Sequence, residues 1–402
     1  MNEIQPILAL AISFSIIIVL VANKKNFGAA MLGGALLLGL LSGIGDISHV
    51  VIDTLTDLDV LALVVIVVLI KVFATTLQES GQISLVIEHL KRIIPPRGML
   101  ATIPFLFGLL PIPGGALLSA PMIDVHGKKL QVSSEGRTFI NLWFRHIGFL
   151  VFPLSTALVV MSQVSEIHIT RLIVHQIPVF IMALLLGGVY IIRLSAKIPQ
   201  DVAAPKERST ILRETLVNIC PLVLTILLTF SLATVMEINM AFLISIPTGI
   251  LLSLLLYKDK NFQQLLIKGL SPSLAIAIFG IMLFRNMAYA SGVTDVVADY
   301  LQQTAVPALI IIPLVSFIIG VLTAHNMAAI PLLYSMLAPL IGGDVYLVSL
   351  LYISSFMGYL ISPLHLCVVV SYDYFKPRFA VLYKLMLPPA IVITIFAVLL
   401  SL

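Results

Sequence analysis

The 402-residue chain is 60% hydrophobic and only 10% charged, with a mean hydropathy of +1.12. This composition excludes an ordinary soluble domain, since such domains carry about 25% charged residues, and it predicts a protein that crosses a membrane many times. The net charge of +4 does not indicate nucleic-acid binding, because the charges lie in predicted loops with a strong bias to one side. Cys220 and Cys367 lie in separate apolar runs, so neither a disulfide nor a metal site is expected.

Ten apolar stretches are long enough to cross a membrane, because a span needs about 20 mainly apolar residues. The first stretch lacks a basic leader and is followed by Lys24 and Lys25, so we expect a retained span rather than a signal peptide. The predicted spans are 5–22, 28–44, 60–80, 139–163, 170–193, 214–234, 238–257, 271–290, 346–370 and 379–401.

Two further apolar stretches, 98–124 and 305–340, are interrupted near the middle. In the first, prolines and glycines at 111–115 leave two arms of about 10 to 13 residues, each about 15 to 20 Å long at the helical rise. Such an arm reaches half way across a bilayer, which favours a re-entrant hairpin. The alternative of two kinked spans stays open.

The hairpin interpretation places the basic loops on one face and most acidic loop residues on the other. The basic face includes Lys91, Arg92, Lys128 and Lys129. By the positive-inside rule this face is cytoplasmic, so both termini are predicted outside.

The chain repeats unusual features at a spacing of 210 residues. The segment from Gly148 to Leu154 recurs from Gly358 to Leu364, each with a proline at its sixth position. Each half has five spans and one hairpin, and the odd number of spans inverts the second half. The predicted fold is an all-α integral membrane protein with two inverted repeats, 1–194 and 211–402, joined by a cytoplasmic linker loop at 195–210. Each repeat has a re-entrant hairpin and a broken helix, and duplicated breaks of this kind mark transporter binding sites.

Backbone groups freed at mid-membrane helix breaks need a partner, so the breaks hold the candidate substrate-binding residues. Helices that start there present free N–H groups to an anion, whereas carbonyls at the hairpin tips are candidate Na⁺ ligands. The first half contributes Gly114, Gly115, Ser119, Ser155 and Thr156, and the second half contributes Thr323, His325, Asn326 and His365.

Histidines stand at the breaks of the second half only. His325 and His365 follow Gly115 and Ser155 by 210 residues. Since histidine titrates near neutral pH, both are candidates for carrying a coupling proton. The alternative is that each hydrogen-bonds a neighbouring helix.

Three cations lie inside predicted spans, and an intramembrane charge is a functional hypothesis by default. Arg145, Arg285 and Lys71 are candidates for balancing the charge of a substrate. Alternatively, Arg145 extends to the cytoplasmic surface, while Arg285 and Lys71 pair with carboxylates near helix ends, of which Glu79 is an example.

The order of spans, hairpin and a helix broken at Pro153-Leu154-Ser155-Thr156, repeated in inverted form, resembles the ion transporter superfamily of secondary carriers. That superfamily includes dicarboxylate, citrate, gluconate and arsenite transporters. The stretch from Pro111 to Ala116 is similar to an uncharacterised family of ten-span prokaryotic membrane proteins. The resemblance implies a site between the hairpin tips and the broken spans, a homodimer, and the plasma membrane of a prokaryote.

The leading hypothesis is a secondary active transporter of a small organic anion, coupled to H⁺ or Na⁺ by alternating access. Neither an enzymatic activity nor a cofactor is expected. The expected partners are the small anionic substrate, the lipid bilayer and a second copy of the chain, with no nucleic acid.

Two alternatives remain. One is an intramembrane enzyme or lipid-phosphate handling protein that uses Ser119, His146, His325 and His365, although no carboxylate lies deep in a predicted span to orient a base. The other is a passive channel, which hairpin tips would plug.

Overall fold

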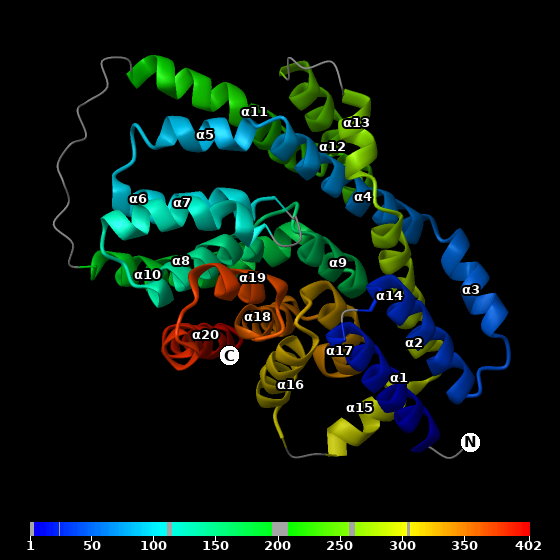
Figure 1. Cartoon of the computed structure of the whole chain (residues 1–402). Coiled ribbons are helices and arrows are strands. Elements are labelled where there is room, and N and C mark those ends of the chain that lie inside the picture. The colour runs from blue at the N-terminus through cyan, green and yellow to red at the C-terminus, as the bar shows by residue number, and fades with distance from the viewer. Residues whose placement is uncertain (1–3, 24, 111–114, 195–207, 257–261, 304–305) are drawn as a thin grey trace.

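The computed structural model describes residues 4–23, 25–110, 115–194, 208–256, 262–303 and 306–402 (Figure 1). The described chain is all-helical, with 84% of residues in helices and no strand. The predicted linker loop at 195–210 falls largely outside the described residues, and so do residues 111–114 of the predicted first hairpin tip.

The first half contains α1 (Ile4–Ala22), α2 (Phe27–Leu41), α3 (Ile47–Thr56), α4 (Leu58–Glu79), α5 (Gln82–Leu90), α6 (Pro96–Gly108), α7 (Ala116–Lys129), α8 (Ser134–Ile147), the short 3-10 turn η1 (Gly148–Leu150), α9 (Thr156–Ser165) and α10 (Ile169–Ile192). The second half contains α11 (Arg208–Leu232), α12 (Ile238–Leu256), α13 (Phe262–Gly269), α14 (Pro272–Ala290), α15 (Val293–Gln303), α16 (Ala308–Thr323), α17 (Asn326–Ile341), α18 (Val345–Ile361), α19 (Leu366–Phe375) and α20 (Phe379–Leu400).

Seven segments of the described chain are long and apolar enough to cross a membrane. They are α4, α10, α11, α12, α20, the stretch from Gln263 to Ala290, and the stretch from Val345 to Phe375. The predicted spans at 5–22 and 28–44 correspond to the shorter apolar helices α1 and α2. Large apolar side chains are also exposed, with Leu58 at 80% and Ile192 at 73%. Broad exposed apolar surface is rare on soluble monomers and fits contact with lipid.

Helix packing follows one pattern in both halves. α2 packs against α14 while α12 packs against α4, and α7 contacts α19 while α17 contacts α9. In addition, α6 packs on α8 and α16 packs on α18. Several of these pairs join the two halves, so the halves are interlocked rather than separate.

Glycines allow two of these helix pairs to approach closely at matching points. A Cβ atom on Gly108 of α6 would overlap the carbonyl oxygen of Arg145 on α8. Likewise, a Cβ atom on Gly320 of α16 would overlap the carbonyl oxygen of Ser355 on α18. Small residues permit such backbone contact between membrane helices. The contact at Gly108 fixes the backbone of Arg145.

The helices break at the two prolines that the sequence singles out. α8 and η1 are separated from α9 near Pro153, and α18 is separated from α19 near Pro363. Proline cannot donate a backbone hydrogen bond and clashes with the preceding helical turn. Tyrosines on other helices satisfy freed carbonyls: the Tyr352 hydroxyl donates to Phe149 O at 3.0 Å, and the Tyr383 hydroxyl donates to Ile361 O at 2.8 Å.

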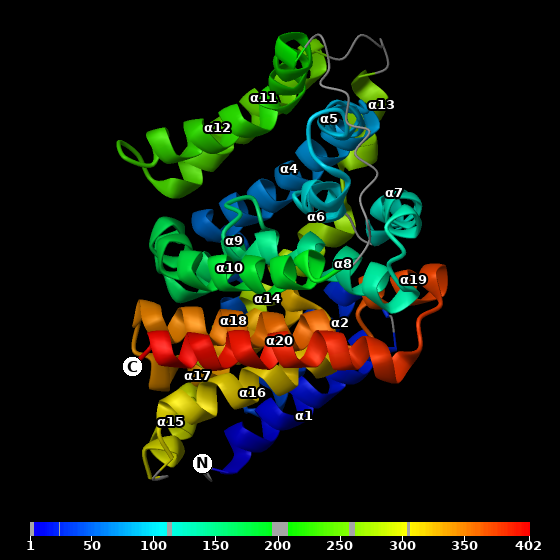
Figure 2. The ribbon, with the colours of Figure 1, turned by 90° about the vertical axis from the view of Figure 1, so that its left-hand side faces the viewer.

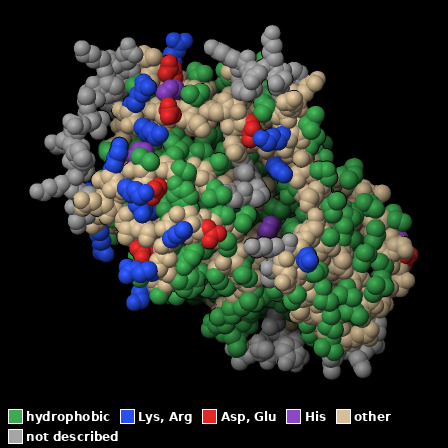
Figure 3. Space-filling view, in the orientation of Figure 1, with side chains coloured by type: hydrophobic (Ala, Val, Ile, Leu, Met, Phe, Trp, Pro, Cys, Tyr) green, Lys and Arg blue, Asp and Glu red, His purple; other side chains and the backbone are tan. Residues whose placement is uncertain are grey.

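Both described chain ends lie at the same end of the molecule, on the left in Figure 2. On the face seen in Figure 3, charged side chains gather at the left and top, whereas the lower and right-hand parts are largely hydrophobic. Ion pairs also join the halves. In one of them, Arg378 Nε, at the start of α20, donates to Glu135 Oε1, in the first turn of α8, at 2.9 Å. The hydrogen bonds from Arg378 and from backbone N–H groups lower the pKa of Glu135 to about 2.

Candidate functional site

A cavity of about 360 Å³ lies where the broken helices of the two halves meet. Its walls come from α2, α4, α8, α9, α14, α17, α18 and α19. Figure 3 shows a hollow near the centre of the viewed face with a histidine on its wall. Six of the residues predicted from the sequence line the cavity: Arg145, Ser155, Thr156, His325, Asn326 and His365.

Three helices begin at this cavity without a side chain that caps them. Ser155, His325 and His365 stand at the N-cap positions of α9, α17 and α19, and none of their side chains accepts a hydrogen bond from the helix it precedes. By contrast, Asp57 caps α4, whose start lies away from the cavity. The first N–H groups of a helix have no intrahelical partner and favour negative charge. The cavity is therefore bordered by three positive helix ends.

Arg145 brings a cation to the same place. Its side chain is 2% exposed, and Nε and Nη1 have no hydrogen-bond partner within the described residues. It does not extend to the surface, which was one of the two expectations. Lys71 on α4 adds a second cation to the lining, and the described lining contains no Asp or Glu. The cavity thus carries uncompensated positive charge.

His325 and Asn326 contribute polar groups that are free to bind a ligand. The His325 ring packs against Phe27, with ring centroids 4.6 Å apart, and Nδ1 is buried without a partner in the described chain. Both polar atoms of the Asn326 side-chain amide are likewise buried without a described partner. Buried polar atoms are normally hydrogen-bonded, so unpartnered ones need an explanation, such as a ligand. Their assignment to substrate, and that of His325 and His365 to proton coupling, stays a prediction.

Two predicted residues lie beside the cavity and not in its described lining. A Cβ atom on Gly115, just before α7, would overlap Nη2 of Arg145. Gly115 therefore lies against the guanidinium. Thr323, the last residue of α16, donates from Oγ1 to Ile319 O at 2.8 Å, and its neighbour Ala324 reaches the cavity. Gly114 lies outside the described residues.

Two other predicted residues have different partners. The Ser119 hydroxyl donates to Asn141 Oδ1 at 2.6 Å, and Asn141 Nδ2 donates onward to Ser371 Oγ at 3.0 Å. This network joins α7, α8 and α19. Arg285 pairs with Glu166 at 2.7 Å, at the end of α9. This matches the alternative expectation of a carboxylate near a helix end.

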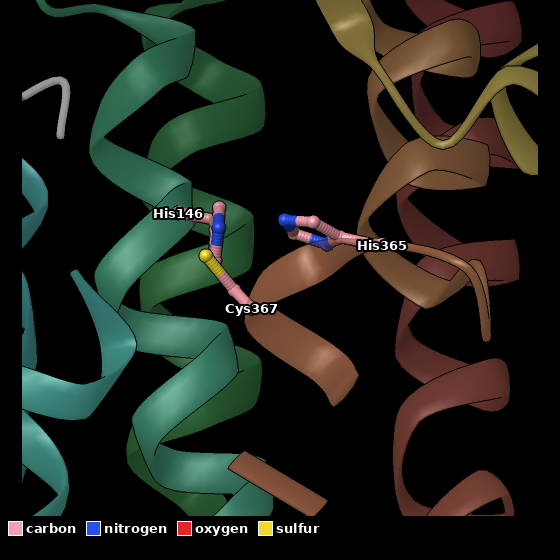
Figure 4. Close-up of side chains that lie close together, drawn as sticks. All are labelled: His146, His365 and Cys367. Carbon is pink, nitrogen blue, oxygen red and sulfur yellow. The ribbon is translucent and has the colours of Figure 1, made fainter. Parts of the chain in front are cut away.

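The structure also brings together three side chains that the sequence did not connect. His146, His365 and Cys367 are buried, and their nitrogen and sulfur atoms lie within 4.8 Å of one another (Figure 4). Because Cys367 lies in an apolar run, no metal site was expected from the sequence, whereas this cluster has metal-binding donors. The Tyr359 ring packs on His365, with centroids 4.0 Å apart. The only sequence signal was local: Cys367 lies two residues after His365, a predicted break residue.

The chain belongs to the family described as protein of unknown function (DUF401), whose model matches residues 7–402. The comparison with curated proteins found no match.

Proposed function

We propose that this DUF401 protein is a secondary active carrier that moves a small organic anion across the plasma membrane of a prokaryote by alternating access. The observation that carries the proposal is the cavity, in which the buried guanidinium of Arg145 faces the open N-termini of α9, α17 and α19. Transporters commonly bind anions at the N-termini of broken helices.

The charge balance of the cavity favours an anion. A buried charge is costly unless it is paired, and Arg145 has no carboxylate partner within the described chain. A carboxylate-like substrate would pair with the guanidinium and with the free helix N–H groups. A volume of about 360 Å³ lies at the lower end of the usual range for small-molecule sites, roughly 300–1,000 Å³. The substrate class is therefore a small organic acid.

The recurring helix order supports a carrier built from two inverted repeats. The series α1 to α10 is followed by α11 to α20 with matching short and long helices, and the packing pairs recur between the halves. In this proposal, α6 with α7 and α16 with α17 are re-entrant hairpins that enter from opposite faces. Both chain ends lie outside, and the basic loops lie in the cytoplasm. A homodimer remains an expectation from the resemblance.

Accumulation against a gradient needs a coupling ion, H⁺ or Na⁺. His325 is the proposed proton carrier, because it stands at the N-cap position of α17 without a capping hydrogen bond and lines the cavity with its Nδ1 unpartnered in the described chain. The charged and titratable groups that share the cavity with it are Lys71, Arg145, His146, Tyr359, His365 and Cys367. Na⁺ would instead bind carbonyl oxygens at the hairpin tips.

An intramembrane enzyme is the less favoured function. Its candidate serine nucleophile is Ser119, whose hydroxyl donates a hydrogen bond to Asn141 rather than to a histidine. Ser119 also does not line the cavity. A nucleophile needs a base within hydrogen-bond reach. The described geometry does not supply that pair.

The test is uptake into sealed proteoliposomes of labelled mono- and dicarboxylates, sugar acids and inorganic oxyanions. Sodium and proton gradients are imposed independently. Saturable accumulation of one compound under one gradient supports the carrier and names its substrate and coupling ion. Flux that never exceeds equilibrium would favour a channel, and no flux for any compound would overturn the organic-anion carrier.

A further inference from the structure

The cluster of His146, His365 and Cys367 has the geometry of a metal site. His146 comes from α8, His365 from the break before α19, and Cys367 from the first turn of α19. Figure 4 shows the His146 ring beside the Cys367 sulfur, with the His365 ring approaching from the opposite side. The centroids of the two histidine rings lie 4.8 Å apart at an interplanar angle of 78°. Three donors from two helices thus surround one point in the cavity wall.

Each donor is available to a cation. His146 Nδ1 lies 2.7 Å from Leu142 O, so this nitrogen carries the proton and Nε2 keeps its lone pair. Neither ring nitrogen of His365 has a hydrogen-bond partner in the described chain. Cys367 stands in the first turn of α19 and lines the same cavity, and a cysteine sulfur at such a place is a potential metal ligand. The two unpartnered nitrogens of His365, which are buried beside His146 and Cys367, call for a ligand.

We infer that His146, His365 and Cys367 bind a thiophilic d¹⁰ cation, with Zn²⁺ as the ion to test. Two imidazoles and one thiolate suit such an ion, whereas Mg²⁺ and Ca²⁺ prefer oxygen ligands. Zinc bonds of about 2.0 to 2.3 Å place the ligand atoms roughly 3.3 to 3.8 Å apart. The observed spread of up to 4.8 Å is about an ångström wider, so metal binding would draw the three side chains together by about that distance.

Three protein ligands leave a fourth position, and all three residues line the cavity from which a ligand could reach it. Catalytic zinc sites keep one coordination position open for water or substrate, whereas structural zinc sites have protein ligands at all four positions. The metal site stands on its own geometry, but its role rests on the proposed function: an oxygen of the anionic substrate would fill the fourth position while Arg145 pairs with the remaining charge. The anion and the Cys367 thiolate would together offset the charge of the ion.

The experiment uses Co²⁺ as a spectroscopic substitute for Zn²⁺ in the purified full-length protein. Cys220 is exposed on α11 and is replaced by serine in every sample, so that Cys367 supplies the only thiolate. We expect a thiolate-to-cobalt charge-transfer band with the d–d bands of a four-coordinate ion, removed by Zn²⁺. Cys367→Ser should abolish the band. His146→Gln and His365→Gln should each weaken binding at least about tenfold, since even loss of an outer-shell partner costs about 10–100-fold.

His325→Gln is the matched control, because His325 lines the same cavity and is not one of the three donors. It should keep the band. A second measurement needs no change at the site: Zn²⁺ should slow alkylation of Cys367 in the Cys220→Ser protein. The site is refuted if no charge-transfer band forms, or if Zn²⁺ leaves the alkylation rate unchanged.

Adding succinate or another compound of the uptake panel to the cobalt-loaded protein tests whether the metal contacts the substrate, separately from whether the metal binds. A shift of the cobalt d–d bands supports the open position, and unchanged bands with every compound refute it while leaving the metal site in place. Because metal binding is read without any transport, failure of the carrier proposal would not remove the cobalt signal.

Discussion

The guanidinium of Arg145 occupies the space that a side chain on Gly115 would need, since a Cβ atom there would overlap Nη2. A residue at the start of α7 therefore determines where the buried cation of α8 lies. This relationship explains why the small residue belongs to the site although it offers no side chain to a ligand. It also means that adding one methyl group at position 115 tests whether the position of the Arg145 guanidinium matters for anion binding.

Gly115→Ala should displace the guanidinium and weaken anion binding by roughly tenfold or more, because about 1.4 kcal/mol of lost charge pairing corresponds to a factor of ten. Lysine has a smaller head group than arginine, so in the Arg145→Lys protein a methyl group at position 115 meets less crowding. The effects of Gly115→Ala and Arg145→Lys on anion binding should therefore not add. The measurement is a double-mutant cycle, in which the affinity for the identified substrate is compared among the original protein, the two single variants and the double variant. Additive effects would show that the two residues do not interact.

Arg145→Met should abolish substrate binding without lowering the melting temperature. The variant removes a buried charge that has no carboxylate partner in the described chain and two nitrogens without a hydrogen bond, and such a buried charge destabilises the folded state. Arg285→Met is the informative comparison, because it leaves Glu166 without its ion-pair partner. That variant should unfold at a slightly lower temperature and still bind substrate. Normal uptake by Arg145→Met would rule out its role.

Gly108→Ala and Gly320→Ala should each destabilise the protein by about 2 kcal/mol or more, since overpacking against rigid backbone costs about 1–3 kcal/mol. Each added methyl group would overlap a carbonyl oxygen of the facing helix. Gly188 on α10 has open space around its Cβ position, so Gly188→Ala serves as the control. It should be neutral or stabilising by up to about 1 kcal/mol. Thermal unfolding of the detergent-purified proteins measures the stability of the three variants relative to the unchanged protein.

His325→Gln should abolish proton-driven accumulation while substrate exchange at equal pH continues. Glutamine keeps a polar group in the cavity but cannot carry a proton across the pH range of the experiment. The control is His175→Gln, because His175 packs against Tyr346 on another part of α18 and does not line the cavity. Accumulation by His325→Gln under a proton gradient alone would remove His325 from the coupling step.

Glu135→Gln should lower the melting temperature at neutral pH and have a smaller effect near pH 3. The folded protein holds the pKa of Glu135 at about 2, below its ordinary value of 4.5. The ionised carboxylate therefore stabilises the fold above about pH 4.5, and this stabilisation is lost as the pH falls towards 2. Melting curves of both proteins between pH 7 and pH 3 measure the difference. An equal difference at every pH would exclude a charge effect from the bond with Arg378.

The helix breaks and much of the cavity could be predicted from the sequence because their causes are local. Pro153 and Pro363 end helices whatever packs around them, and residues beside a break are the ones left to meet a ligand. The repeated spacing then placed Ser155 and His365 at matching points, and both line the cavity. Inversion of the repeats and re-entrance of the hairpins stay predictions.

Partnerships between distant residues could not be predicted, because they depend on how the two halves interlock. His146 and Cys367 come from different halves, and nothing in either local sequence indicates the other. The same holds for Arg285 and Glu166, which lie 119 positions apart. Periodicity describes which face of one helix is apolar, and it does not state which helix covers that face.

The exchange of partners between the halves has a consequence for how the chain is made. While the first half is being synthesised, α2 lacks α14, α4 lacks α12 and α9 lacks α17. The faces of these helices that contact the second half stay without their partners until the later helices are inserted. The cavity is therefore completed only after almost the whole chain has entered the membrane. A stalled or truncated product would display the unpaired faces of these helices, which gives quality-control proteases a clear signal for its removal.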